Sequence, residues 1–149
     1  MRQERKEDLS VYYYINDLFS GDSITTVDGF PESNLELPSV AVEATTVEPI
    51  KFELGNRNRV RIRTWYIYVF AQTKAQRDEI GYRILDSLEQ CIPVYDYDEG
   101  FPPDTTPTNL GCLNVDYLKM EIIRVMPELV DKLYYRAVIS FTAQFDQLN

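Results

Sequence analysis

The alternation of hydrophobic and polar residues predicts most of the regular structure of this chain. Residues 3–19 repeat apolar side chains at helical spacing, which indicates an amphipathic helix. Residues 40–45 and 50–54 alternate residue by residue instead, which is typical of strands. The second of these segments either continues the first strand or pairs with it. A short strand is also expected near residues 24–27, inside a loop that spans residues 21–38.

The strongest pattern follows the turn signal Gly55-Asn56, where a hairpin leads into a long strand at about residues 57–71. Successive side chains of a strand point to opposite faces. Four arginines therefore share one face at its start, and we call them the arginine row: Arg57, Arg59, Arg61 and Arg63. Four apolar residues continue that face into the expected core: Trp65, Ile67, Val69 and Ala71. The strand is expected to begin outside the domain and to end inside it.

The second half of the chain predicts one helix and three strands. Residues 73–76 have the form of a capping box, so a helix is expected at about residues 74–91. Gly81 lies inside this helix, and a close approach of the helix to the sheet would explain it. Strands are expected over residues 92–95, 113–125 and 133–145. The first of them contains a proline, which favours a sheet edge.

This order of elements predicts an α+β fold. We expect a mainly antiparallel or mixed sheet, flanked by the N-terminal helix and by the central helix at about residues 74–91. A single domain over residues 1–149 is expected, because no linker or internal repeat divides the chain. A Pro-rich connection at about residues 96–111, which we call the acidic loop, has no periodic pattern. Connections of that length are usually functional or mobile.

Composition and charge argue against nucleic acid and membranes as partners of this protein. The chain has 149 residues, 44% of them hydrophobic, and its net charge of −9 disfavours global binding to nucleic acid. No apolar run approaches the roughly 18–20 residues that span a bilayer, and the charged N-terminal segment lacks the apolar stretch of a signal peptide. We therefore expect a soluble protein made in a cytoplasm, with no membrane partner. For Cys91 and Cys112, the only cysteines, reduced buried thiols are favoured over a disulfide.

The residue types that common enzymes need are missing. Histidine is absent, which removes the usual general base and the usual metal ligand. The sequence has no Walker loop, dinucleotide-binding turn or zinc-spaced cysteine cluster. Residues 96–100 resemble the start of a calcium loop but lack its later ligands, so a solvated acidic loop is favoured. We expect no enzymatic activity, no cofactor and no metal site.

The arginine row has three interpretations. In the first, the row belongs to a solvated edge strand whose charge prevents unwanted strand pairing. In the second, it docks on an acidic face of a neighbouring subunit, and in the third it contacts phosphate groups. Docking suits arginine because its planar fork can bind a carboxylate through two hydrogen bonds, whereas the net charge argues against phosphate. The acidic loop of an adjacent copy offers four carboxylates as partners: Asp96, Asp98, Glu99 and Asp104.

Six segments carry a family resemblance: LPSVAVE at 37–43, FELG at 52–55, IYVFA at 67–71, QRDE at 76–79, IPVYDY at 92–97 and KLYYRAVISF at 132–141. They resemble virion neck proteins of tailed bacteriophages, and among these the tail terminator (tail-completion) proteins most of all. The resemblance covers most of the chain from about residue 35 onward. It implies a sheet flanked by helices and a hexameric ring that caps the tail tube, stops its growth and joins it to the head connector.

The resemblance also implies partners and a location. The partners would be further copies of the chain, the tail tube protein and the connector or stopper proteins, in a virion neck assembled in the host cytoplasm. DNA would pass through the ring without specific binding, since an acidic lumen repels phosphates. No catalytic residues carry over from the family. The alternatives are another head–tail joint such as a stopper or adaptor, a tube- or sheath-associated tail protein, or an enzyme or small-ligand protein.

Overall fold

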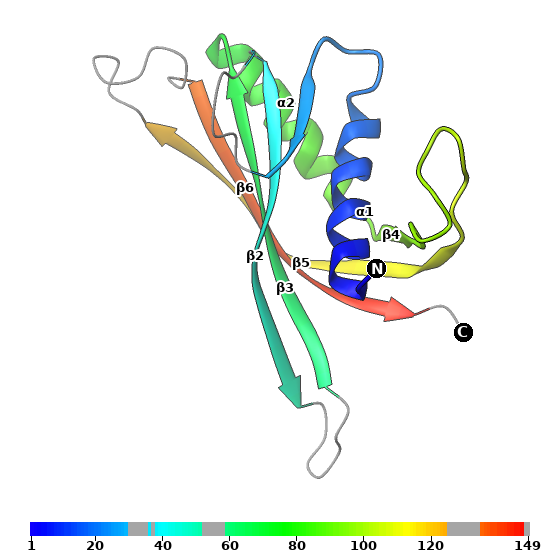
Figure 1. Cartoon of the computed structure of the whole chain (residues 1–149). Coiled ribbons are helices and arrows are strands. Elements are labelled where there is room, and N and C mark those ends of the chain that lie inside the picture. Colours follow the sequence, from blue (N-terminus) through cyan, green and yellow to red (C-terminus); the bar gives the residue numbers. More distant parts are fainter. Residues whose placement is uncertain (30–35, 37, 52–58, 125–134, 148–149) are drawn as a thin grey trace.

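The computed structural model describes residues 1–29, 36, 38–51, 59–124 and 135–147, which form two helices on one face of a six-stranded sheet (Figure 1). The helices are α1 (Gln3–Leu18) and α2 (Lys74–Leu88). The strands are β1 (Thr25–Asp28), β2 (Ser39–Lys51), β3 (Arg59–Ala71), β4 (Ile92–Tyr95), β5 (Asn109–Arg124) and β6 (Tyr135–Gln147). The expected α+β fold with two flanking helices is confirmed.

The sheet is mixed, with the strand order β1-β2-β3-β6-β5-β4. Within the described residues β1 runs parallel to β2, and the other neighbouring strands are antiparallel. Residues 50 and 51 continue β2 past an irregularity between Ala44 and Thr46, so the two expected segments form one strand. Lys51 pairs with Arg59, as the expected hairpin requires, while the turn residues 52–58 lie outside the described residues. The short strand β4 lies at a sheet edge, as its proline predicted.

The core lies between the helices and the inner face of the sheet. Trp65, Ile67 and Val69 of β3 are fully buried, as their alternation predicted. Helix α1 contributes Val11 and Ile15 to the same cluster, and α2 contributes its own buried face: Ile80, Ile84 and Leu88. Burying such a side chain stabilises the fold by about 1.5–3 kcal/mol. This cluster therefore holds both helices on one face of the sheet.

Helix α2 begins as predicted. The Thr73 hydroxyl accepts a hydrogen bond from the Gln76 amide at 3.1 Å, and the Gln76 side chain accepts one from the Gln72 amide at 2.8 Å. A Cβ atom added to Gly81 would lie 2.9 Å from the sulfur of Met120 on β5. The close approach of helix and sheet expected at this glycine is thus confirmed.

The cysteine prediction was wrong. Cys91 and Cys112 form a disulfide, with their Cα atoms 5.9 Å apart. Helix α2 ends at Leu88 rather than near residue 91, and β4 then pairs with β5 so that Pro93 lies opposite Cys112. The prediction rested on the expected cellular compartment, but this strand register is what brings the two cysteines together.

The acidic loop is shorter than expected and has defined turns. It ends at residue 108, because β5 already begins at Asn109. The Asp96 amide donates to the Thr108 carbonyl at 2.9 Å, which closes the base of the loop, and the Thr105 amide donates to the Phe101 carbonyl at 3.1 Å. The predicted start of β5 at residue 113 was therefore wrong. Gly111 pairs within the sheet, although a glycine usually indicates a turn.

Candidate assembly interface

The arginine row begins in the hairpin and ends inside the fold. Arg57 lies outside the described residues, and of Arg59 only the backbone, the first residue of β3, is described. Arg61 is exposed and pairs with Glu4 of α1. Arg63 is only 4% exposed and lies on the same face as Trp65, as the alternation predicted. The row therefore runs from the end of the hairpin to the underside of α1.

Arg63 is bound within its own chain through its two terminal nitrogens, while its buried Nε has no hydrogen-bond partner among the described residues. Its Nη2 lies 2.8 Å from an Asp8 carboxylate oxygen, and its Nη1 donates to the Glu4 carbonyl at 2.8 Å. The same nitrogen lies 3.7 Å from the Glu7 carboxylate, and the guanidinium stacks over Trp65 at 4.8 Å from the ring centre. Arg63 is thus almost fully buried, which argues against the prediction that it lies at a subunit interface.

Burial dominates the electrostatics around Arg63. It raises the pKa of the Glu7 carboxyl and that of the Asp8 carboxyl, although the nearby Arg63 guanidinium acts in the opposite direction. The Trp65 indole also donates to Asp8 at 3.3 Å, which satisfies a second acceptor position of that carboxylate. We call Arg63, Glu7 and Asp8 the buried charge cluster. Its ion pairs link α1 to β3.

The acidic loop is also neutralised within the chain. Lys6 of α1 pairs with Asp96 at 2.9 Å and with Asp98 at 3.0 Å, and we call these three residues the exposed charge cluster. The amino group of Met1 lies 2.8 Å from Asp98 as well. Hydrogen bonds from these two amines lower the pKa of the Asp98 carboxyl. Lys6 therefore pairs with two of the carboxylates that resembled a calcium loop.

The other two predicted carboxylates remain at the surface. Glu99 accepts a hydrogen bond from the Thr108 hydroxyl at 3.0 Å, which is a contact within the acidic loop. Asp104 is exposed and forms no ion pair with a described residue. The structure therefore does not bring the arginine row and the acidic loop of one chain together, and Glu99 and Asp104 remain accessible to another protein.

Sequence reasoning missed the role of the first turns of α1. Glu4, Glu7 and Asp8 provide the acidic partners of Arg61 and Arg63, while Lys6 provides the basic partner of the acidic loop. The signal was present in the sequence. Glu7 and Asp8 directly precede the apolar face of the helix, where an unpaired carboxylate would be costly to bury.

The outer end of the β2–β3 hairpin is a two-stranded ribbon. Strand β6 pairs with β3 only from Ile62 onward, and β1 pairs with β2 only over Ser39–Val42. Residues 49–51 and 59–61, which we call the ribbon, thus pair only with each other among the described residues. Figure 1 shows this hairpin projecting beyond both helices. A two-stranded ribbon is marginally stable in water, so it gains most from a further partner.

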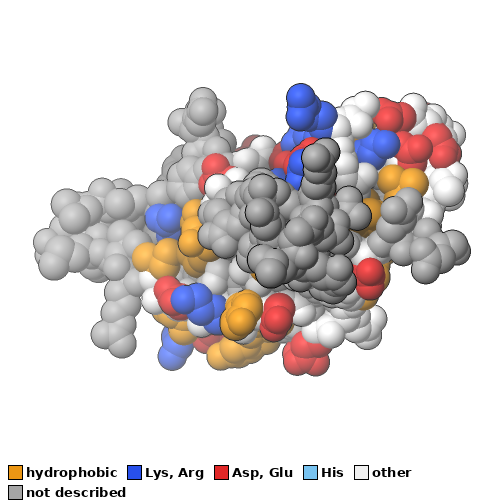
Figure 2. Space-filling view, turned by 90° about the horizontal axis from the view of Figure 1, so that it is seen from below, with side chains coloured by type: hydrophobic (Ala, Val, Ile, Leu, Met, Phe, Trp, Pro, Cys, Tyr) orange, Lys and Arg blue, Asp and Glu red, His pale blue; other side chains and the backbone are white. Residues whose placement is uncertain are grey.

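A second open edge lies at the far side of the sheet. Strand β4 pairs with β5 only as far as Leu113, so residues 114–124 of β5 have no neighbour on their outer side among the described residues. Tyr117 here is 79% exposed, and Lys119 and Glu121 are exposed as well. Figure 2 shows acidic and basic side chains mixed over the face seen from below, with no broad patch of one sign among the coloured residues.

The described part of the chain contains no group of three or more His, Cys, Asp or Glu residues placed to hold a metal ion. None of its helices combines the length and the apolar character that crossing a membrane requires. Comparison with protein-family models and with curated proteins finds no match to this chain.

Proposed function

We propose that this protein is a non-catalytic, ring-forming component of a phage virion neck, a tail terminator that caps the tail tube and joins it to the head connector. The resemblance in sequence supports this role, and so does one structural feature above all. The hairpin projects from the fold as a ribbon with unpaired edges, which is unfavourable for an isolated chain and favourable at a contact between subunits.

The two open edges are suited to a ring because they differ from each other. The ribbon lies at the β2 and β3 end of the sheet, and the exposed half of β5 lies toward the other edge. A contact between two different surfaces of adjacent copies is head-to-tail, and such contacts close into a ring when the rotation between copies allows it. Arg61 and Arg59 would contribute to that contact from the ribbon.

The charge of the chain supports a ring through which DNA passes. Each copy carries a net charge of −9, and several copies around one lumen add their fields. Phosphates are repelled by such a lumen, so the genome would move through without specific binding. The proposed partners are further copies of the chain, the tail tube protein, and connector or stopper proteins.

Native mass spectrometry of the full chain, alone and with tail tube protein, tests this proposal. We expect a hexamer in at least one of the two samples. The double variant Arg59→Glu with Arg61→Glu should remain monomeric, because it reverses the charge of the ribbon. A matched control, Arg2→Glu with Lys74→Glu, changes the net charge equally at two exposed positions outside the hairpin and should still assemble.

Circular dichroism and thermal unfolding establish that both variants fold. A wild-type chain that stays monomeric under both conditions contradicts ring formation. A ribbon variant that forms normal hexamers contradicts only the assignment of the ribbon as the contact surface.

A further inference from the structure

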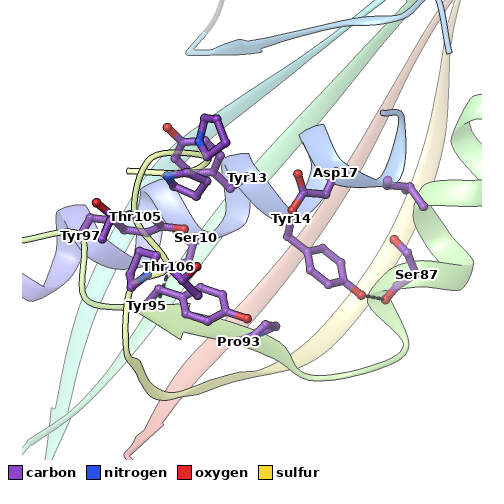
Figure 3. Close-up of a pocket in the computed structure, with 14 residues that line it drawn as sticks. Ser10, Tyr13, Tyr14, Asp17, Ser87, Pro93, Tyr95, Tyr97, Thr105 and Thr106 are labelled. Carbon is purple, nitrogen blue, oxygen red and sulfur yellow. Dashed lines mark hydrogen bonds between the residues drawn. The ribbon is translucent and has the colours of Figure 1, made fainter. Parts of the chain in front are cut away.

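A cavity of about 570 Å³ lies between α1, β4 and the acidic loop (Figure 3). Its walls are unusually rich in tyrosine: Tyr13 and Tyr14 come from α1, Tyr95 from β4 and Tyr97 from the start of the loop. Prolines and threonines of the acidic loop also line it, and Figure 3 shows Thr105 near Tyr97 and Thr106 near Tyr95. Sites for small ligands occupy roughly 300–1,000 Å³, so the cavity is large enough to bind one. We call it the tyrosine pocket.

The aromatic wall of the tyrosine pocket is held in place by packing. Tyr13 stacks on Tyr97 with their ring centres 5.3 Å apart, and Tyr95 meets Tyr97 edge-on at 6.4 Å. Phe101 covers the other side of Tyr97 at 5.7 Å, which leaves Tyr97 only 3% exposed. The Tyr14 hydroxyl donates to the Ser87 carbonyl at 2.6 Å and so ties the pocket to α2. A wall fixed in this way binds with little loss of side-chain freedom.

The tyrosine pocket collects hydrogen-bond acceptors and negative charge. Asp17 is the only charged side chain among the described residues that line it. Burial raises the pKa of Tyr97 to about 12; a hydrogen bond with Ser10 acts in the opposite direction, and the charges of Tyr13, Tyr95 and Asp17 raise it further. The phenol groups of Tyr13, Tyr95 and Tyr97 and the carboxylate of Asp17 line the same pocket. The ammonium of Lys6 in the first turns of α1 is already paired with Asp96 and Asp98. Arg83 of α2 donates to the carbonyl of the lining residue Leu18 at 3.1 Å and also pairs with Asp22.

This environment fits one kind of ligand best. The faces of tyrosine rings carry negative potential and attract cations, and a carboxylate adds to the attraction. A guanidinium group is planar, stacks on such rings and offers five N–H donors to the surrounding oxygens, whereas an ammonium is compact and strongly hydrated. The cavity is far larger than a guanidinium group alone, and its proline and tyrosine surfaces can cover an aliphatic stem.

We propose that the tyrosine pocket binds an arginine side chain presented by another protein chain. The guanidinium stacks against the half-buried rings of the wall, Tyr13, Tyr14 and Tyr95, and pairs with Asp17. The aliphatic stem lies against the prolines of the acidic loop. The inference rests on the pocket alone and does not require a ring. In the proposed ring, Arg61 or Arg59 of the next copy would be a suitable source.

The first test compares N-acetyl-arginine methylamide with N-acetyl-citrulline methylamide, which has nearly the same shape but no charge. Binding is followed by NMR of the full-length protein with ¹³C-labelled tyrosine rings. We expect the arginine compound to shift the resonances of Tyr13, Tyr95 and Tyr97 in a saturable way, and to bind about tenfold more tightly than the citrulline compound. Equal affinity for both compounds, or no binding of either, would overturn the proposal.

Variants test the assigned contact. Asp17→Asn should weaken binding of the arginine compound about fivefold or more, because it removes the charge and keeps the shape. Asp86→Asn is the matched control, since Asp86 is an exposed carboxylate on α2 outside the pocket. Unchanged affinity of the Asp17→Asn variant, or an equal loss in the Asp86→Asn control, contradicts the assignment.

A final comparison tests whether the pocket binds an arginine within a protein chain or any small guanidinium cation. A peptide with the sequence of residues 56–62, NRNRVRI, should bind more tightly than guanidinium chloride, because the pocket also covers the stem and backbone. If guanidinium chloride binds as tightly as the peptide, the pocket is a site for small free cations, and the part of the proposal that concerns a protein chain fails.

Discussion

Two charge clusters flank the first turns of α1, and they differ chiefly in their access to water. In the buried charge cluster the side chains of Arg63 and Glu7 are 5% and 6% exposed. The third member of that cluster, Asp8, is 22% exposed. In the exposed charge cluster the side chains of Lys6, Asp96 and Asp98 are 13%, 26% and 47% exposed, so the acids are more open to water while the lysine is mostly covered. Both clusters bind one cation between two carboxylates. Their expected contributions to stability nevertheless differ widely.

The difference follows from desolvation. A buried ion pair has lost its water, so removing one partner leaves an uncompensated charge and destabilises a protein strongly. An exposed pair exchanges its partner for water and salt ions, and removing one side chain changes little. The buried cluster therefore fixes the position of α1 on the sheet. The exposed cluster only links α1 to the acidic loop, which forms one wall of the tyrosine pocket.

The largest expected effect comes from replacing Arg63 by methionine. Arg63→Met keeps the volume of the side chain but leaves Glu7 and Asp8 buried without their cation, which should lower the free energy of unfolding by about 3–5 kcal/mol. Urea unfolding followed by circular dichroism measures this loss. Arg61→Met is the control, because Arg61 belongs to the same row and its side chain is 57% exposed. A loss in Arg63→Met no larger than that in Arg61→Met would show that burial does not distinguish the two positions.

The sequence could predict most of the fold. Periodicity located both helices and the strands of the described regions, because each of these elements buries one face, and burial forces a regular spacing of apolar residues. It misplaced the start of β5, since Gly111 and the prolines before it break the pattern even though residues 109–111 pair in the sheet. The disulfide could not be predicted, because it depends on how β4 and β5 align.

The candidate site was only partly predictable. The alternation on β3 placed the arginines on the core face, and Arg63 lies there. Their partner was not predictable from spacing, because α1 precedes β3 by more than forty residues and contacts it only in the folded chain. The tyrosine pocket was missed for the same reason. Its residues come from α1, β4 and the acidic loop, and their patterns are each explained by core packing alone.

A smaller effect is expected from neutralising one acid of the buried charge cluster. Because burial raises the pKa of Glu7 in the folded state, the stability linked to this group is fully present below its ordinary value of about 4.5 and is lost as the pH rises. Glu7→Gln removes this loss while Arg63 keeps Asp8 as a partner. The variant should therefore gain stability relative to the wild type between pH 4.5 and pH 7.

Urea unfolding at several pH values across this range measures the gain, with Glu79→Gln on the exposed side of α2 as the control. Asp8 shifts in the same direction, so the wild type retains part of its pH dependence in the Glu7→Gln variant. If Glu7→Gln instead loses stability relative to the wild type as the pH rises, the attraction to Arg63 outweighs desolvation, and the account of the buried cluster is wrong.

The smallest effect is expected in the exposed charge cluster. Lys6→Gln removes the cation that holds Asp96 and Asp98, and global stability should change little, as is usual for exposed pairs. The acidic loop should open more often, so hydrogen exchange should speed up at the amides of Asp96 and Thr105, whose bonds close the loop, and not in β3. Lys119→Gln is the control, because its exposed pair with Glu121 lies on β5. Unchanged exchange at both amides would mean that the backbone bonds alone hold the loop, and Lys6 would then have no part in shaping the tyrosine pocket.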